Sequence, residues 1–181
     1  MRGTEAKLIV GLGNHGKEFL RTKHNVGFLA IDYLAYQLGI GLRSNYKLRG
    51  LVGEKDGVIL YKPFSSMNIL GFNVAVITKD RKIKPENIML VHDELELRKG
   101  ICKFRDGNLS HIGHNGIKSV QKTLKNNNFK RIRIGIDRPK SRAPKVVGSY
   151  VLSDLSKNDI STLNDKSFPQ VLDFVQNKFL I

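Results

Sequence analysis

Short apolar runs alternate along the chain with segments whose apolar residues recur at helical spacing. Buried strands are expected at 7–12 (KLIVGL), 57–62 (GVILYK), 88–91 (IMLV) and 131–136 (RIRIGI). Helices are expected between them, over 25–38, 68–78 and 117–124. Parallel strands need a crossover segment, which is usually a helix. The alternation therefore predicts an α/β fold: a single three-layer α/β/α domain over residues 1–181, with a mixed, mostly parallel, twisted sheet.

Weaker signals complete this outline. Segments 46–53 and 101–104 are expected to add strands, and the C-terminal tail is expected to hold one or two further helices. Gly39 is placed to end the first helix, and Thr22 or Asn25 is placed to cap its start. In folds of this class, functional groups gather beyond the carboxyl ends of the strands.

The sequence favours a cytoplasmic protein. Its longest apolar runs fall far short of the ~20 residues that a membrane-spanning helix needs. Met1 to Lys7 are not followed by the apolar stretch and small residues of a secretory signal. The single cysteine, Cys102, has no partner for an internal disulfide and is expected to pack in the core.

Positive charge is concentrated in the middle of the chain. The formal net charge is +15, and residues 98–145 contain 14 basic side chains against two acidic ones. Such a field attracts a polyanion, because neutralised phosphates release their counterions. Nucleic acid is therefore the leading partner. A solvated basic surface is the alternative, and an anionic membrane is less favoured because these residues share no helix with a broad apolar face.

Two glycine motifs follow the first strand, and both lack their context. Residues 11–16 (GLGNHG) match a dinucleotide-binding pattern, but the helical period begins only near Phe28. Gly11, Gly16 and Lys17 also match part of a P-loop, but Glu18 stands where a serine or threonine would bind the metal. A nucleotide-binding fold is thus a minor alternative.

Metal and serine-nucleophile chemistry have little support in the sequence. His111 and His114 are three residues apart, but a metal would need a third ligand from elsewhere. No metal or other cofactor is expected. No G-x-S-x-G motif is present, so a hydrolase of this sequence is expected to use water as its nucleophile.

Polar residues interrupt the apolar pattern in four clusters. They are Asn14, His24-Asn25, Met67-Asn68, and His92-Asp93 with His114-Asn115. Taken singly, each asparagine or aspartate fits a turn or a helix cap, and His24 fits an exposed position before a helix. Together they supply a base, an acid to orient it, and neutral amides. A histidine oriented by a carboxylate can take a proton from water, and amides can stabilise the oxyanion that forms. This set suits hydrolysis of an activated ester.

The clusters lie within segments that resemble one family in order and spacing. These segments are VGLGNHG (10–16), TKHNVG (22–27), MN (67–68), HDELEL (92–97), GHNG (113–116), RIRIGI (131–136) and KVVGSYVL (145–152). They resemble bacterial-type peptidyl-tRNA hydrolase from about residue 7 to residue 152. The resemblance implies a phosphorylase/hydrolase-like fold and a monomeric cytoplasmic enzyme. It also implies that the enzyme recycles tRNA from prematurely released peptidyl-tRNA, with no obligate protein partner.

The resemblance also implies roles for individual residues. His24 would activate the water that attacks the ester between peptide and tRNA, and Asp93 would keep His24 in its basic form. Asn14 matches the position that distinguishes peptidyl-tRNA from free aminoacyl-tRNA. The other matched positions bind substrate: Phe19, Ser66, Met67, Asn68, His114 and Asn115, with Arg105 and Arg133 as a basic pair for the tRNA 5′ phosphate.

The chain departs from the family pattern at several places. His15 replaces a proline, Ser66 replaces a phenylalanine, and Leu70 replaces a small polar residue. The loop Gly107 to Ile112 has fewer glycines than usual and is expected to be stiffer. These departures motivate an alternative to the enzyme, namely a non-catalytic tRNA-binding module on the same fold. A nucleotide-binding protein with a degenerate P-loop is the third hypothesis.

Overall fold

The computed structural model describes residues 5–108 and 113–181, which form a seven-stranded sheet flanked by helices. The strands are β1 (Lys7–Gly11), β2 (Arg43–Asn45), β3 (Gly50–Lys55), β4 (Val58–Pro63), β5 (Ile88–Glu94), β6 (Cys102–Arg105) and β7 (Lys130–Gly135). Their order is β2-β3-β4-β1-β5-β7-β6. The four central strands, β4, β1, β5 and β7, pair in parallel, and the outer pairings are antiparallel. β3 and β6 thus run against the other five strands, which confirms a mixed, mostly parallel sheet.

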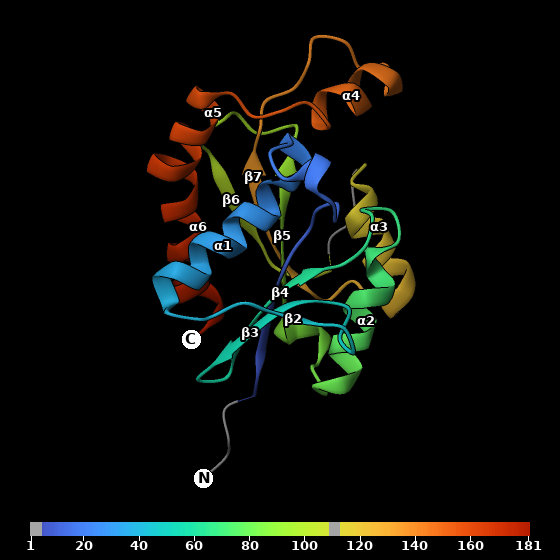
Figure 1. The fold of residues 1–181 in the computed structure, drawn as a ribbon, viewed down its shortest axis with the longest axis vertical. Coiled ribbons are helices and arrows are strands. Elements are labelled where there is room, and N and C mark those ends of the chain that lie inside the picture. Colours follow the sequence, from blue (N-terminus) through green and yellow to red (C-terminus); the bar gives the residue numbers. More distant parts are fainter. Residues whose placement is uncertain (1–4, 109–112) are drawn as a thin grey trace.

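The sheet separates two layers of helices. The helices are α1 (Val26–Leu38), α2 (Leu70–Asp80), α3 (Asn115–Leu124), α4 (Pro144–Val151), α5 (Lys157–Thr162) and α6 (Phe168–Phe174). Single 3₁₀ turns form η1 (Lys17–Phe19), η2 (Lys23–Asn25) and η3 (Pro85–Asn87), and π-helical segments form η4 (Leu163–Ser167) and η5 (Val175–Phe179). Figure 1 shows α1 and α6 on one side of the sheet and α2 and α3 on the other.

Each face of the sheet has its own apolar core. Successive side chains of a strand point to opposite faces. Ile9 of β1 accordingly packs in the core beneath α1 and α6. Its neighbours Leu8 and Val10 pack in the second core, beneath α2 and α3. The central strands are therefore apolar on both sides, which explains their unbroken apolar runs.

The predicted elements are confirmed, with one exception. The strand predicted over 46–53 is wrong in its first half, because residues 46–49 form a turn and β3 begins at Gly50. Arg49 has a left-handed φ of 57°, which interrupts an extended strand. The tail holds α4 and one unbroken helical run over 157–179, made of α5, η4, α6 and η5, which confirms the one or two further helices predicted there.

The two predicted signals around α1 have different outcomes. Gly39 does end the helix, in the left-handed conformation that favours glycine. The Asn25 side chain makes no capping hydrogen bond to α1, so its predicted role as a cap is wrong. The Thr22 side chain likewise makes no capping hydrogen bond to η2.

Glycines allow α1 to start against the ends of the central strands. A Cβ atom on Gly27 would lie 2.3 Å from the carbonyl oxygen of Val91 in β5. A Cβ atom on Gly11 of β1 would lie 2.6 Å from the carbonyl oxygen of Gly27. Only a residue without a side chain permits this approach, which places the turn before α1 over the carboxyl ends of β1 and β5.

The lengths of the helices and the position of Cys102 bear on two further predictions. In residues 5–108 and 113–181, the helices are too short or too polar to cross a lipid bilayer. Cys102 is buried in the core beneath α1 and α6, which confirms its predicted packing role.

Candidate active site

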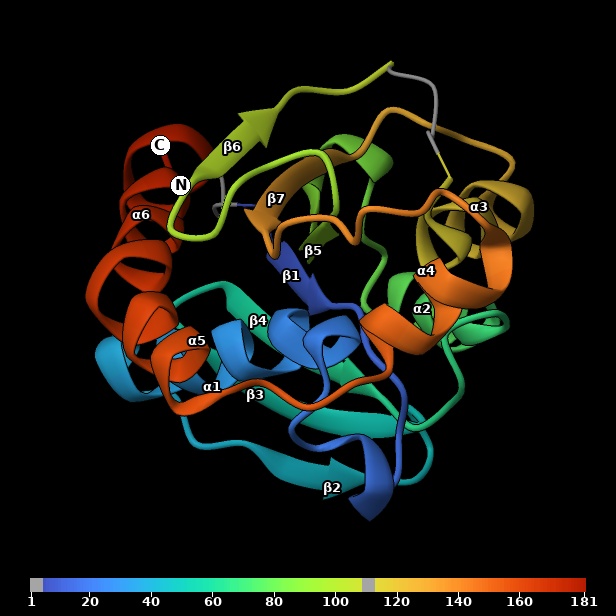
Figure 2. The same cartoon turned by 90° about the horizontal axis from the view of Figure 1, so that it is seen from above.

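Three polar side chains meet at the carboxyl end of the central strands. Asp93 lies near the end of β5, His24 lies in η2 just before α1, and His114 is the N-cap of α3. The Nδ1 atom of His24 is 2.9 Å from Oδ2 of Asp93, and Nε2 of His114 is 2.8 Å from Oδ1. Figure 2 looks onto this end of the sheet, where α1, α3 and α4 surround the ends of β1 and β5.

The hydrogen bonds determine which ring nitrogens carry hydrogen. Nδ1 of His114 accepts from the backbone amides of Gly116 and Ile117, at 3.1 and 3.4 Å, so Nε2 carries the hydrogen and donates to Asp93. An ionised Asp93 likewise accepts from Nδ1 of His24. The Nε2 atom of neutral His24 therefore keeps its lone pair. This is the tautomer that a general base needs.

Electrostatics favour an ionised Asp93 beside a basic His24. Burial raises the pKa of Asp93, but the charges and hydrogen bonds of His24 and His114 outweigh it and hold this pKa well below its usual range. Burial lowers the pKa of His24, but the Asp93 carboxylate raises it by charge attraction and hydrogen bonding, and the net pKa lies above the usual histidine value. His24 is thus a stronger base than a free imidazole.

His92, next to Asp93 in β5, has a different environment. It is fully buried, and its Nδ1 donates to the backbone carbonyl of Asp93 at 2.8 Å. Its ring packs edge-on against His114, with 4.8 Å between centroids. Burial, followed by the nearby His114, lowers the pKa of His92 well below its usual value. This residue is therefore a neutral packing group behind the pair of Asp93 and His114.

A cleft of about 500 Å³ opens over these residues. His24, Asp93, His114 and Asn115 form one side of it. The other side is formed by α4 with the segment before it, and its lining includes Pro144, Val147, Gly148, Val151, Arg138 and Arg142. Glu96 on the rim bonds Arg138, with Nη2 to Oε1 at 2.9 Å. A base therefore faces a cleft with both apolar and charged walls.

Asn14 lies in a second polar group, next to the first. Its Oδ1 accepts from the backbone amide of Met67 at 2.7 Å, which leaves Nδ2 able to donate. The Asn25 side chain holds the main chain of Asn14 on both sides, accepting from its N at 2.8 Å and donating to its O at 2.9 Å. Since Asn25 directly follows His24, this contact ties Asn14 to the turn that carries the base.

The remaining predicted substrate-binding residues surround this centre. Met67 is buried, and its sulfur lies against Gly116 in the first turn of α3. Ser66, Asn68 and Asn115 are exposed and are accessible to a ligand. Phe19 is half-buried at the end of η1 and does not line the cleft.

The predicted basic pair lies at the β6-β7 edge of the sheet and does not itself line the cleft, although Arg133 bonds Glu94, which does. Arg133 pairs across the ladder with Lys103, and Arg105 pairs with Arg131, so the four side chains share one face. Arg105 is exposed. Arg133 is half-buried, and its Nη2 is 2.5 Å from Oε1 of Glu94. Part of the Arg133 charge is therefore balanced within the protein.

Three structural features of the site are not specified by the sequence pattern. The sequence places Asn25 in a polar cluster and as a helix cap, but its bonds to the main chain of Asn14 leave no periodic signal. The buried Lys23 donates to Ser153 Oγ at 2.8 Å and to the Asp154 carbonyl at 3.1 Å, which joins η2 to the end of α4. The third feature is the wall of the cleft that α4 forms. It falls within the KVVGSYVL segment (145–152), which the family resemblance includes.

The three polar side chains and the glycine motif after β1 are the features on which a metal site or a nucleotide site would depend. His24, Asp93 and His114 are of metal-binding types, and their ligand atoms lie within 4.8 Å of one another. The hydrogen bonds that join them account for the arrangement. His111 and residues 109–112 of the loop discussed above lie outside the described residues. The helix after the glycine motif starts at Val26, and Gly11 packs against Gly27, so these glycines serve packing.

Comparisons with known proteins identify the family and the fold. The family model described as peptidyl-tRNA hydrolase matches residues 8–180. The peptidyl-tRNA hydrolase of Exiguobacterium is 40% identical over 181 residues, covering 96% of each chain. That of Lactobacillus johnsonii is 38% identical over 180 residues, covering 95% of this chain and 94% of the relative. The crystal structure of the enzyme from Acinetobacter baumannii superposes with a TM-score of 0.86 at 35% identity, covering 96% of this chain and 88% of that one. The chain belongs to the peptidyl-tRNA hydrolase family.

Proposed function

We propose that the chain hydrolyses the ester that joins a peptide to the terminal ribose of tRNA, and so recycles tRNA from prematurely released peptidyl-tRNA. One observation carries this proposal. His24 donates through Nδ1 to the buried Asp93, its Nε2 makes no hydrogen bond within residues 5–108 and 113–181, and the residue lines a cleft of about 500 Å³. Family membership supports the identity of the ester.

The residues support a water-mediated mechanism. Nε2 of His24 takes a proton from a water molecule, and the water oxygen adds to the ester carbonyl carbon. Asp93 stabilises the imidazolium that forms. When the tetrahedral intermediate collapses, the carbon–oxygen bond to the ribose breaks, and the proton on His24 passes to the leaving ribose oxygen. The products are a peptide carboxylic acid and tRNA with a free hydroxyl.

Neutral amides are placed to stabilise the oxyanion and to hold the substrate. Nδ2 of Asn14 is available to donate, and Asn68 and Asn115 are exposed near the same centre. Amides can donate to a developing negative charge without competing for the proton. We assign Asn14 to recognition of the blocked amino group, as the family resemblance implies. Substrate groups next to the scissile ester bond are assigned to four further residues, Asn68, Asn115, Met67 and His114.

The RNA portion is assigned to the basic surface at the β6-β7 edge, where Arg105 is exposed and Arg133 is half-buried. Arg105 and Arg133 lie on one face of the β6-β7 edge, within the segment that holds most of the excess positive charge. Arginine forks bind phosphate oxygens in pairs, so this edge suits the 5′ phosphate of tRNA. Phe19 and Ser66 complete the assigned RNA-contacting residues. We propose that the enzyme acts as a cytoplasmic monomer, without a cofactor or an obligate protein partner.

The test is the release of N-acetyl-aminoacyl groups from tRNA, measured beside unblocked aminoacyl-tRNA. We expect rapid hydrolysis of the blocked ester and little hydrolysis of the free one, with no effect of added EDTA. Binding of tRNA without hydrolysis at any enzyme concentration would contradict the proposal and favour the non-catalytic module. A loss of activity in EDTA that zinc restores would instead assign His24, Asp93 and His114 to a metal.

A further inference from the structure

We propose that exposed aromatic rings beside the active site form a stacking surface for unpaired nucleobases at the 3′ end of the RNA substrate. This aromatic strip consists of His15, Tyr46, Arg49, Phe64 and Phe72. The identity of the RNA rests on the proposed function, whereas the chemistry of the surface rests on the contacts below. Neither the cleft nor the basic edge includes these residues.

Three rings of the strip contact one another: His15 and Tyr46 are exposed, and Phe64 between them is half-buried. Phe64 lies in the middle, 4.7 Å from the His15 ring and 6.0 Å from the Tyr46 ring between centroids. Tyr46 is 83% exposed, although tyrosine usually buries most of its ring. Its phenol therefore contributes little to the core, and its faces are available to a ligand.

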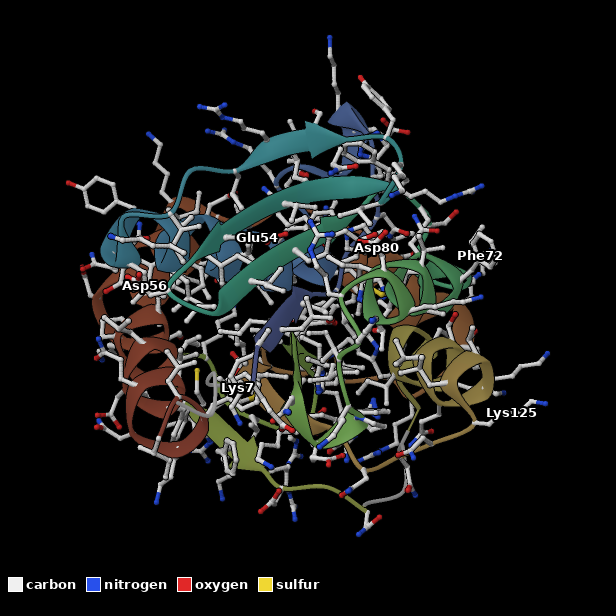
Figure 3. All side chains as sticks on the ribbon, turned by 90° about the horizontal axis from the view of Figure 1, so that it is seen from below. Lys7, Glu54, Asp56, Phe72, Asp80 and Lys125 are labelled. Atoms are coloured by element: carbon white, nitrogen blue, oxygen red, sulfur yellow. The ribbon has the colours of Figure 1, made fainter. Side chains whose placement is uncertain are left out.

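The strip extends to α2 because the Arg49 side chain contacts the ring of Phe72. The guanidinium of Arg49 lies over the Phe72 ring, 4.9 Å from its centroid. The backbone carbonyl of Arg49 accepts from the amide of Phe64 at 2.8 Å, which holds Arg49 beside the first set of rings. Phe72 is 53% exposed and stands out from α2 at the edge of the molecule in Figure 3. Flat π faces thus extend from the loop after β1 to α2.

The strip lies at the same end of the sheet as the active site. Gly50, which follows the 46–49 turn, pairs with Pro63 at the carboxyl end of β4. His15 directly follows Asn14, and its amide donates to the Ser65 carbonyl at 3.0 Å. Asn14 in turn bonds Met67 and Asn25, next to His24. A ligand whose ester is at His24 can therefore continue onto the strip.

The local chemistry favours unpaired nucleobases. Residues 43–49 (RSNYKLR) include three basic side chains and no acidic one, so phosphates are attracted to the turn that carries Tyr46. Single-stranded RNA binds where aromatic faces stack on successive bases and cations follow the backbone. Arginine stacked on an aromatic ring adds a further planar face. A neutral peptide would gain from the rings but not from these charges.

The test is an NMR titration with the unacylated trinucleotide CpCpA, which has the unpaired end of tRNA but no ester. Tyr46→Leu and Phe64→Leu are each expected to raise the Kd for CpCpA about tenfold. Tyr36→Leu is the matched control, because Tyr36 lies on α1 and is 85% exposed, and its Kd should equal that of the wild type. Thermal unfolding verifies that each variant is folded. Tyr46 is so exposed that its replacement should not affect folding.

Two controls separate the possible results. An abasic trinucleotide should bind equally to the wild type and to both variants, because it has charge but no base to stack. Equal CpCpA affinity in Tyr46→Leu, Phe64→Leu and the wild type would overturn the proposal. The proposal would also be overturned if Tyr46→Leu and Phe64→Leu lost affinity for an N-acetylated peptide but kept wild-type affinity for CpCpA. The strip would then bind the peptide and not the nucleobases.

The outcome is independent of the test of the proposed function, because CpCpA binding requires no hydrolysis. Intact ester hydrolysis with ring-independent CpCpA binding would overturn the strip alone. Ring-dependent CpCpA binding in a protein that hydrolyses no ester would support the strip and overturn the proposed activity.

Discussion

The proposed catalytic centre and the proposed RNA-facing surfaces of this protein are built in opposite ways. In the centre, Asp93 is buried, and each of its carboxylate oxygens accepts from a different histidine. On the RNA-facing surfaces, Arg105 and Tyr46 are exposed and are placed by the sheet edge or by a turn. Chemistry is thus assigned to a few preorganised groups, whereas recognition is spread over many exposed ones.

This difference separates the expected effects of substitutions. Removing a group from the centre should lower kcat and leave tRNA affinity nearly unchanged, because that group acts mainly in the transition state. Removing an exposed cation should raise KM and reduce the salt dependence, because it contributes to binding of the phosphate backbone. Each prediction below tests whether a residue belongs to one region or to the other.

The largest effect is expected at the base. His24→Ala removes the group that takes the proton from water, and general-base catalysis typically contributes about 10²- to 10⁴-fold. We expect the single-turnover rate constant on N-acetyl-aminoacyl-tRNA to fall by that factor, with the Kd for tRNA unchanged. A variant that keeps near-wild-type turnover would exclude His24 from the mechanism. A variant that loses tRNA binding instead would move His24 to the recognition surface.

An intermediate effect is expected at Asn25, which joins the two polar groups of the site. Asn25→Ala removes both hydrogen bonds to the main chain of Asn14 and leaves buried polar atoms without partners, at a cost of about 1–3 kcal/mol in the free energy of unfolding. We expect kcat to fall about tenfold, which would correspond to about 1.4 kcal/mol of transition-state stabilisation. Chemical denaturation and steady-state kinetics provide the two measurements.

A conservative variant sharpens the Asn25 prediction. Asn25→Asp keeps an oxygen that can accept from the amide of Asn14, but it loses the donor to the carbonyl of Asn14. Because one of the two hydrogen bonds remains, the kcat of Asn25→Asp should lie between that of the wild type and that of Asn25→Ala. Wild-type kinetics in both variants would show that Asn14 is positioned by other contacts, such as its bond to Met67.

The smallest effect on the chemical step is expected at the basic edge. Replacing Arg105 and Arg133 together with alanine should raise KM for full-length tRNA substrates and make the dependence on salt shallower, with kcat unchanged. Lys157 and Lys178, which are exposed and lie away from this edge, provide a control with the same loss of charge. If the control pair had the same effect, net charge alone would explain the result. If a short ester without the 5′ phosphate were affected equally, the phosphate assignment would be wrong.

The sequence predicted the strands that carry the site better than the residues that hold the site together. Strands such as IMLVHDE have unbroken apolar runs because both faces are buried, and the polar residues that end them necessarily meet at one edge of a parallel sheet. Asn25 and Lys23 act through bonds to distant main chain, which no local pattern records. The strip is another such case, because Tyr46 and His15 each meet Phe64 through the fold.

The turn over 46–49 shows why one predicted strand was wrong. The segment has the β-branched and aromatic composition of a strand only in part, and its end depends on the left-handed φ of Arg49. A non-glycine residue adopts this conformation when its surroundings hold it. Here the Arg49 carbonyl accepts from Phe64, Asn73 and Tyr61, which are distant contacts that the sequence alone does not reveal.

The pH dependence of kcat/KM, measured for the wild type and for Asp93→Asn, tests the central claim most directly. In the proposed mechanism the neutral form of His24 is the active one. Because Asp93 raises the pKa of His24, the wild-type rate should fall with decreasing pH through an apparent pKa above the ordinary value of about 6.5. Without the carboxylate charge, burial alone lowers the pKa of His24. The variant's acid limb should therefore shift to lower pH, while its plateau rate drops about 10²-fold because the tautomer is no longer held. An acid limb that stays in place, or moves to higher pH, would contradict the assignment of His24 and Asp93 as the catalytic pair.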